Sequence, residues 1–479
     1  MLKHIQIYDK KILKEAFLLS LPIILSNISR VAMELVDMIM INNLGAINLF
    51  NGVSMGGILI WVPMSLAIGI RIATQTISSR RYGEKKHHQC GFALRHGLII
   101  GAIMGSILSV LGYLLAETIV PSIVSHKEHI EPTIEYAKYL SIGILPFYLA
   151  CIFQGFFTSI EKTSVHMRVM ITANIINVYL NAGFIYGSEI INYFNSANFD
   201  FISHLWFWAD SEILNPGNSE GLKVKGSAIA TTIATSFMLV HYIYYLFKDN
   251  ITKKYCVLVS TINWKNLKRH FYIASPLFAS EFFLSTSYLA FYIIMENMTQ
   301  TNFAAWGLIL RIMHASFLPA MGIGQACATM VGKYLGEGSN TKARQSIAES
   351  LKLATGMMGF VGLVFILFPY NVINIFNIGL EEATPLAANG LRFVGIFQIF
   401  DAICIVLFFS MSAGGDIKYP VYIEILMHWL IMVPLSWLFG IYLGYGFWGA
   451  ISVFAGQVVF TAIIFIFRIQ SGKWEKIEV

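Results

Sequence analysis

Twelve long apolar stretches fill the sequence, and each is long enough to cross a membrane as a helix. A helix needs about 20 apolar residues to span the hydrocarbon core of a bilayer. Because a helix satisfies its own backbone hydrogen bonds in lipid, stretches of this length predict helices and not strands. We therefore expect an all-α integral membrane protein with twelve transmembrane helices. The predicted spans are 15–41, 49–79, 91–116, 133–158, 164–188, 226–247, 273–297, 303–331, 349–376, 386–413, 418–443 and 447–468.

The composition indicates one large membrane domain. Only 13% of the 479 residues are charged and 56% are hydrophobic, whereas soluble domains carry about 25% charged residues. The net charge of +6 arises in the loops between spans, so we expect no nucleic-acid partner. The sequence has no Walker-type glycine-rich loop, and no serine or cysteine nucleophile has a base at a recognisable spacing. We predict neither an enzyme nor a bound cofactor.

Lysine and arginine are distributed unevenly between alternate loops. With the N-terminus inside, the cytoplasmic segments hold twenty-five of these residues and the outer segments hold five. Cytoplasmic loops of membrane proteins carry the excess of positive charge, so we predict that both termini are cytoplasmic in a multi-pass protein of the inner (plasma) membrane. The longest outer loop, 189–225, is rich in Asn, Ser and aromatic residues, and we expect a small cap there.

The sequence also repeats itself. Gly69-Ile70 recurs as Gly322-Ile323, and Cys151-Ile152 recurs as Cys404-Ile405, both at an offset of 253 residues. Span two therefore corresponds to span eight, and span four to span ten. Since each half begins inside and contains six spans, the repeats are parallel and related by an axis along the membrane normal.

This repeat predicts two pseudo-symmetric six-helix lobes. We expect an N-terminal lobe at 1–248, a basic cytoplasmic linker at 249–272 and a C-terminal lobe at 273–479. Substrate sites in such proteins lie near the membrane midplane, where the repeats meet.

Three charged residues, Arg30, Glu34 and Asp37, lie along one face of the first span. A stripe of charges does not face lipid, so this face is expected to point into protein or water. Arg30 and Glu34 are four residues apart and can form an internal pair that fixes helix packing. Asp37 has no positive neighbour at helical spacing, which favours a function in ion or proton handling.

A second lone aspartate, Asp401, lies in the tenth span, where Arg392 near the outer end is the nearest cation. A carboxyl that exchanges a proton or Na⁺ is what an ion-coupled carrier needs, although a carboxyl can also hydrogen-bond a neighbouring helix for packing. Glu281 follows Pro276 in the seventh span, and for it a site role and a structural role are equally expected. Glu424 in the eleventh span has His428 four residues later, and these two can simply bond each other.

Asparagines mark the fifth span. Asn177 and Asn181 share a helical face, so their side-chain oxygens can coordinate an ion. Asparagine also joins membrane helices by hydrogen bonds, and this alternative stays open. The 36 Phe, 22 Tyr, 9 Trp and 20 Met residues suit flat lipophilic cations through π-face attraction and adaptable packing, although most of them must face lipid or the core.

Characteristic segments lie at 21–45, 80–84, 177–187, 226–231 and 331–338. In this order and spacing they resemble the multidrug and toxic compound extrusion (MATE) family. The family implies antiporters that export organic cations against an inward flow of Na⁺ or H⁺. The segment 397–403 looks like the NorM-type branch, in which the aspartate at the position of Asp401 belongs to the cation site of the second lobe. Two residues depart from that branch, which usually has glutamate at the position of Leu284 and often has tyrosine at that of Phe397.

We therefore predict a secondary active antiporter that moves small organic cations in exchange for Na⁺ or H⁺. We expect a monomer whose other partner is membrane lipid. Asp401 and Glu281 form the predicted coupling-ion site. We expect no other metal than Na⁺, which would bind at Asp401. The predicted substrate or proton site of the first lobe consists of Asp37, Asn177, Asn181 and Glu34.

The alternative within the same superfamily is a flippase for a lipid-linked precursor. A flippase of this kind needs a strongly cationic cavity for a pyrophosphate headgroup. Three arginines inside the spans, Arg30, Arg71 and Arg311, keep this alternative open.

Overall fold

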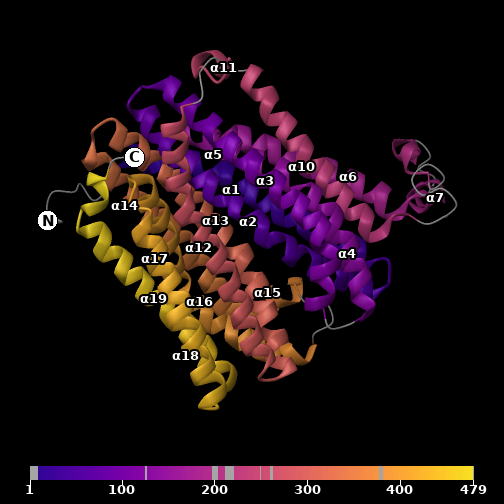
Figure 1. Cartoon of the computed structure of the whole chain (residues 1–479). Coiled ribbons are helices and arrows are strands. Elements are labelled where there is room, and N and C mark those ends of the chain that lie inside the picture. The colour runs from indigo at the N-terminus through magenta and orange to yellow at the C-terminus, as the bar shows by residue number, and fades with distance from the viewer. Residues whose placement is uncertain are drawn as a thin grey trace.

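The computed structural model describes residues 9–124, 127–196, 203–210, 221–248, 250–258, 263–376 and 381–477 (Figure 1). Within these residues the regular structure is entirely helical. Parts of the predicted cap (197–202 and 211–220) and of the predicted linker (249 and 259–262) lie outside the described residues. The longer helices are α1 (Lys10–Asn42), α2 (Ile47–Gly83), α3 (His87–Ile123), α4 (Lys127–Ile142), α5 (Ile144–Ser159), α6 (Thr163–Tyr186), α10 (Lys223–Lys248), α12 (Trp264–Glu296), α13 (Gln300–Gly336), α14 (Asn340–Leu367), α16 (Thr384–Gly414) and α19 (Gly446–Gln470).

The prediction of twelve spans is confirmed. Among the described residues, eleven helices are long and apolar enough to cross a membrane, and the bent pair α4 and α5 makes the twelfth span. The two helices of this pair meet at 49°. Pro146 explains the bend, because it has no N–H to donate to the carbonyl of Ile142 and its ring crowds that carbonyl.

Two spans depart from regular α-helix in ways that the apolar pattern does not reveal. The ninth predicted span, 349–376, ends early as α14, because Phe368 leaves the helical conformation before Pro369 opens the short α15 (Pro369–Phe376). The eleventh span is a run of α17 (Lys418–Leu426), a π-helical segment at 427–432, α18 (Val433–Trp437) and a second π-helical segment at 438–442.

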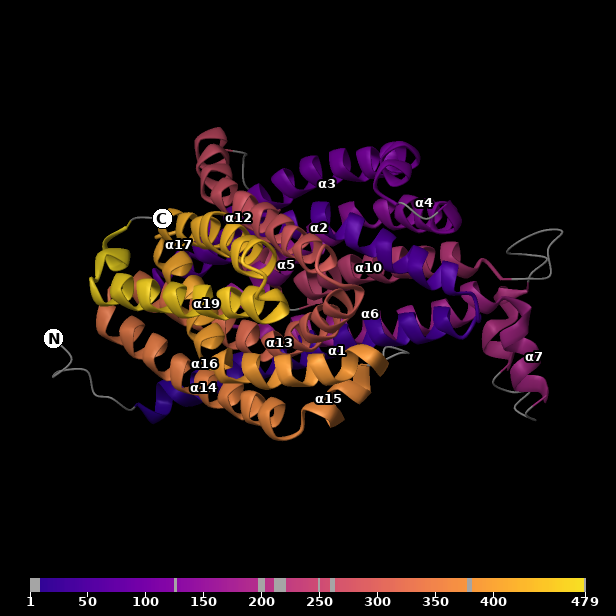
Figure 2. The same cartoon turned by 90° about the horizontal axis from the view of Figure 1, so that it is seen from below.

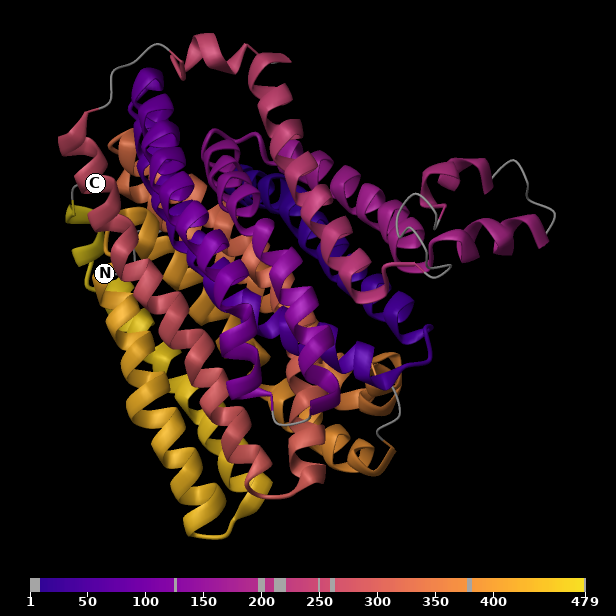
Figure 3. The same cartoon turned by 45° about the vertical axis from the view of Figure 1, so that its right-hand side comes forward.

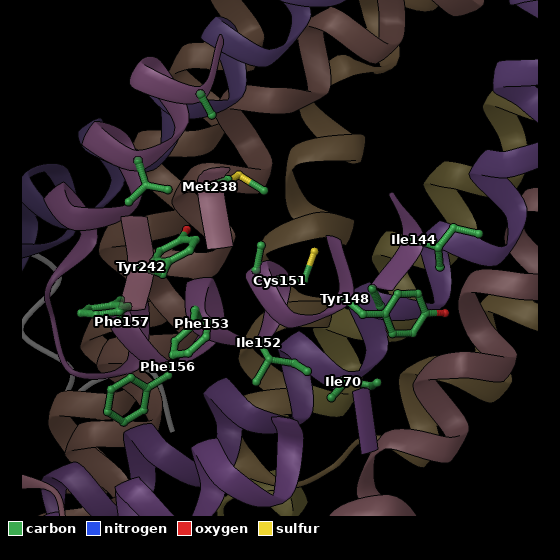
Figure 4. Close-up of a cluster of buried hydrophobic side chains, with 14 of the residues drawn as sticks. Ile70, Ile144, Tyr148, Cys151, Ile152, Phe153, Phe156, Phe157, Met238 and Tyr242 are labelled. Atoms are coloured by element: carbon green, nitrogen blue, oxygen red, sulfur yellow. The ribbon is translucent and has the colours of Figure 1, made fainter. Parts of the chain in front are cut away.

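The helices form two groups that follow the order of the chain. The first hydrophobic core draws only on residues between Ile41 and Val257, and Figure 4 shows the part of it around Phe153, Phe157 and Tyr242. Two further cores consist mainly of residues from the second half of the chain. The predicted architecture of two six-helix lobes is confirmed, and the two ends of the chain lie at the same end of the molecule, as an even number of spans requires (Figure 2).

The first helix of each half crosses to the other half at its cytoplasmic end. Ile23 and Ile24 of α1 belong to the core of the second half, and Ile24 lies against Gly322 of α13. In the same way Phe278 of α12 lies against Gly69 of α2. Gly69 and Gly322 are repeat partners, so the crossing is itself pseudo-symmetric.

The two halves meet in a tight cytoplasmic seam, which we define as the contact between the ends of α2 and α13. A Cβ on Gly83 would lie 1.9 Å from the carbonyl oxygen of Lys333, and a Cβ on Gly336 would lie 2.2 Å from that of Arg80. Gly83 and Gly336 are related by the offset of 253, and so are Arg80 and Lys333. The repeat found in the sequence therefore places two backbones in symmetric contact, and only glycine permits that approach.

Away from the seam the two groups of helices diverge. In Figure 1 the violet helices run from the termini toward α7 (Ser188–Ser196), whereas the orange and yellow helices run toward α18. Among the described residues, the hydrogen bonds between the groups lie toward the cytoplasmic end, as with Gln75 Nε2 donating to Gln325 O at 2.8 Å. The outer surface is apolar, with Ile107 and Leu114 of α3 and Ile175 of α6 exposed, as expected of helices that face lipid.

Candidate functional site

In the first lobe, Asp37 belongs to a buried group of amides. Its side chain is supplied by α1 and the residue is only 9% exposed. Asn181 of α6 donates from Nδ2 to Asp37 Oδ1, and also to Asn177 Oδ1 at 3.0 Å. Asn177 in turn donates to Thr231 Oγ1 of α10 at 3.2 Å. Three helices therefore fix the position of one carboxylate.

This group retains an unused acceptor. Asn181 is fully buried, yet its Oδ1 atom has no hydrogen-bond partner among the described residues. Asp37 also has one carboxylate oxygen beyond the one that accepts from Asn181. Carboxylate and amide oxygens are the ligands that hard cations prefer, and a protonated carboxyl would supply the donor that Asn181 Oδ1 lacks. The arrangement is chemically suited to a proton or a small hard cation.

Glu34 lies one turn before Asp37 but does not join its hydrogen bonds. Its Oε1 atom is 4.0 Å from Nε of Arg30, and its side chain is 56% exposed. The Arg30 guanidinium also lies over the ring of Trp61, 5.8 Å from the ring centroid. The structure therefore separates Glu34 from the Asp37 group and places it in an open, weakly paired position.

In the second lobe, Asp401 of α16 and Glu281 of α12 are both partly buried. Neither carboxylate makes a hydrogen bond or an ion pair among the residues that the structure describes. No such bond joins them to each other either. The buried Arg71 of α2, in the first lobe, is near enough to Glu281 to interact with it electrostatically.

Glu424 of α17 completes this group, and our sequence reasoning did not include it in the site. Ser280 Oγ, beside Glu281, donates to Glu424 Oε2 at 2.9 Å. His428 Nδ1 is 2.8 Å from the backbone carbonyl oxygen of Glu424. His428 thus bonds the backbone of Glu424, and the carboxylate has a different partner. The sequence feature that could have indicated this role is that Glu424 is a glutamate inside a predicted span with no cation at helical spacing.

Tyr288 of α12 lies in the same region of the second lobe. It is near enough to Asp401 and Glu424 to interact electrostatically with both, and its ring centroid is 6.0 Å from that of His428. The π-helical segment of the eleventh span begins just after Glu424, at Met427. Such segments inside α-helices are frequent at functional sites. The second lobe therefore presents the carboxylates of Asp401 and Glu424 near Tyr288, with Ser280 and His428 beside Glu424.

No group of three or more His, Cys, Asp or Glu side chains among the described residues is arranged to hold a metal ion. The helical architecture and the carboxylates inside its spans define a multi-span membrane transporter.

The chain belongs to the MatE family. The family model matches residues 22–182 and again residues 276–438, which coincide with the two halves of the repeat. Its named relatives are membrane transporters, and the chain is a multi-pass protein of the inner membrane, as predicted.

The curated relatives have low sequence identity to this chain but match it over nearly its whole length. A probable multidrug resistance protein NorM of Mesorhizobium japonicum is 22% identical, and the match covers 93% of this chain and 91% of that protein. A protein of the same name from Thermotoga maritima is also 22% identical, covering 97% and 94%. The protein of that name from Mannheimia succiniciproducens is 25% identical, covering 89% and 85%.

Solved structures share the fold over the full length. A multidrug resistance MATE family transporter of the MOP superfamily, described as outward-facing, has a TM-score of 0.84 at 18% identity and 99% coverage of both chains. A MOP superfamily transporter from Pyrococcus furiosus, described as having a binding pocket of reverse polarity, has a TM-score of 0.83 at 18% identity, again covering 99% of both chains.

Proposed function

We propose that this chain is a secondary antiporter that exports small organic cations in exchange for inward Na⁺ or H⁺. The observation that carries the proposal is the presence, in both lobes, of an in-span carboxylate that is not neutralised by an ion pair: Asp37 and Asp401. A carboxylate inside a span is costly unless it handles an ion or a proton. The names of the curated relatives, probable multidrug resistance proteins, favour drug-like substrates.

We assign the coupling ion to the second lobe, and the proton or the substrate to the first lobe. In the second lobe Asp401 binds it, with Glu281 and, beyond our prediction from the sequence, Glu424 nearby. In the first lobe Asp37, held by Asn177 and Asn181, is the proton or substrate site. Glu34 takes the role of an exposed anion, one turn nearer the cytoplasmic end of α1, that attracts an organic cation toward Asp37.

Transport in this proposal requires the lobes, residues 1–248 and 273–479 joined by the linker 249–272, to rock about their interface. The cytoplasmic seam is closed in this structure, because Gly83 and Gly336 each lie against a backbone carbonyl of the other half. Lys333 contributes to the closure, because its Nζ atom lies 3.0 Å from Glu15 Oε1 and 2.5 Å from Glu161 Oε1. These pairs must separate before the cytoplasmic side opens.

Exchange follows if the ion and the organic cation compete for the same negative charges. Coupling between two ligands is reciprocal, so each must weaken the binding of the other by the same factor. We propose that the protein acts as a monomer, with one pathway between its own two lobes.

One interaction, between Arg71 and Glu281, supports the flippase alternative. Arg71 is buried at the interface between the halves and interacts with Glu281, and the Pyrococcus neighbour is itself described as having a pocket of reversed polarity and a different function. Arg311, in contrast, is exposed. Because acidic groups outnumber Arg30 and Arg71 at the interface, we place the antiporter first.

The test is ethidium efflux from proteoliposomes under an imposed Na⁺ or H⁺ gradient. We expect efflux by the wild type, and its loss in Asp401→Asn and Asp37→Asn. Glu296→Gln is the matched control, since Glu296 is exposed at the outer end of α12. If both aspartate variants export at the wild-type rate with the same ion dependence, the assigned sites are wrong. If no organic cation moves under either gradient, the flippase alternative gains.

A further inference from the structure

The outer cap has no part in the proposed transport sites, and its described residues are fixed to one particular face of α6. The short 3₁₀ helix η2 (His204–Ala209) is held there by its two tryptophans. Trp206 Nε1 donates to the backbone carbonyl of Tyr179 at 3.0 Å, and Trp208 Nε1 donates to the Tyr179 hydroxyl oxygen at 2.7 Å. The Tyr179 hydroxyl donates in turn to the backbone carbonyl of Leu205.

The face of α6 that receives η2 is the one that faces lipid. Ile171 and Ile175 are exposed on α6, and Tyr179 follows at the same spacing of four residues. Tyr179 is therefore the next position on an exposed apolar stripe, and η2 covers the stripe at this point. Gly183, one turn further, has no side chain, and a Cβ there would lie 2.3 Å from the Trp208 ring. The absence of that side chain allows η2 to lie flat against the helix.

The opposite side of η2 exposes large apolar side chains. Phe207 is 74% exposed and Leu205 is 51% exposed, while Trp206 and Trp208 hydrogen-bond to Tyr179 of α6. Tyr179 lies two helical turns before the end of α6 at Tyr186, which corresponds to a depth of about 10 Å. In Figure 3 the cap that contains α7 extends sideways from the ends of α6 and α10, and does not continue their direction.

We propose that η2 is a membrane anchor that inserts Phe207 and Leu205 into the boundary between headgroups and acyl chains of the outer leaflet. The apolar surface of η2 is continuous with the lipid-facing stripe of α6, so the occupant is the same bilayer. Amphipathic segments in membrane interfaces bury their apolar face about 5–10 Å deep. Tryptophan and tyrosine, which tie η2 to α6, are enriched at this level.

Spin labels on single cysteines test the anchor, in a background in which Cys256 and Cys404 are replaced. Leu205→Cys and Phe207→Cys are labelled and reconstituted in vesicles of phosphatidylethanolamine and phosphatidylglycerol. Ile175→Cys is the lipid-facing reference. Leu258→Cys is the water-facing reference, because Leu258 is an exposed leucine of the cytoplasmic linker. Power saturation then compares accessibility to oxygen and to a water-soluble nickel chelate.

We expect both cap labels to match the Ile175 reference, with the ratio of oxygen to nickel accessibility several-fold above that of the Leu258 label. A ratio at both cap positions equal to that at Leu258 would show a cap in water and overturn the anchor. Immobile labels that neither reagent reaches would show a protein partner or the other lobe on this surface, and would overturn it too. If one cap variant fails to yield monodisperse protein, the other position decides.

Discussion

The acidic sites of the two lobes lie on different elements of the repeat, since Asp37 is on α1 and Asp401 is on α16, and they have different environments. In the first lobe, Asp37 is buried and held by Asn181, which is itself held by Asn177. In the second lobe, Asp401 and Glu281 are partly accessible and have no hydrogen bond among the described residues. One lobe has a carboxylate in a rigid amide network, and the other has several carboxylates in loose surroundings.

This difference shows which parts of the repeat are fixed by packing. The seam retains the symmetry almost atom for atom, since Gly83 and Gly336 each contact a carbonyl of the other half. The polar interiors do not share it. Close backbone contact tolerates no side chain, whereas a polar site tolerates many different side chains as long as its buried groups find partners. The two sites can therefore have separate tasks within one pseudo-symmetric frame.

The largest expected effect is on transport in the second lobe. Asp401→Asn should reduce gradient-driven efflux by at least about tenfold, equivalent to about 1.4 kcal/mol of activation free energy. The free energy of unfolding should change little, because this carboxylate has no hydrogen-bond partner to lose within the described residues. Efflux assays and denaturant unfolding in detergent measure the two quantities. A strongly destabilised variant would show that Asp401 is a packing residue instead.

The next effect concerns stability in the first lobe. Asn181→Ala removes the donor to Asp37 and to Asn177, and should lower the free energy of unfolding by about 1–3 kcal/mol, because a buried acceptor then lacks its partner. Ser280→Ala is the matched change in the second lobe, where the acceptor Glu424 is only partly buried. Equal losses in the two variants would remove the contrast between a rigid and a loose site.

The seam offers a case in which the lobes should respond alike. Gly83→Ala and Gly336→Ala each place a Cβ against a backbone carbonyl, and overpacking of this kind costs about 1–3 kcal/mol. Gly356→Ala is the control, because no atom lies within 4 Å of its Cβ position. Unfolding measurements on the three variants should show similar losses at the seam and none at Gly356. A loss in only one seam variant would contradict the symmetry of the contact.

A smaller effect is expected from Lys333→Met, which removes the pairs with Glu15 and Glu161. The population with an open cytoplasmic side should rise, because these pairs join different parts of the chain across the seam. Distances between spin labels at the cytoplasmic ends of α2 and α13 measure that population. Lys352→Met is the control, since Lys352 pairs with Glu349 on its own helix. An equal shift in both variants would exclude a specific role for Lys333.

The smallest effect belongs to Glu34. Its pair with Arg30 is long and exposed, and such pairs contribute at most about 0.5 kcal/mol. Glu34→Gln should leave the free energy of unfolding unchanged within that limit, while the apparent affinity for ethidium falls modestly. A stability loss comparable to that of Asn181→Ala would place Glu34 inside the structural network of the first lobe.

The positions of the spans could be predicted because long apolar segments have few alternatives in lipid. The bend at Gly143 and the break at Phe368 follow from Pro146 and Pro369, but an apolar pattern does not distinguish a bent span from a straight one. The repeat offset likewise predicted two lobes, but not that α1 and α12 cross between them.

The site residues could be predicted only in part, because several of them are paired with residues from distant segments of the chain. Glu424 was attributed to His428 because a spacing of four residues offers a local partner. Its carboxylate instead accepts from Ser280, 144 residues away in the sequence. The proximity of Lys333 to both Glu15 and Glu161 depends on three segments meeting at the seam. Periodicity within one helix carries no information on such pairs.

The polar character of the seam has a consequence for how readily it opens. Gln75, Thr76 and Lys333 contact the other half through hydrogen bonds and charges, and the closest approaches involve backbone at glycines. When the halves part, water can hydrate each of these groups, so these polar contacts add little to the free energy of separation. The main cost is the apolar area exposed where Ile72 and Ala73 of α2 share a core with residues of α13.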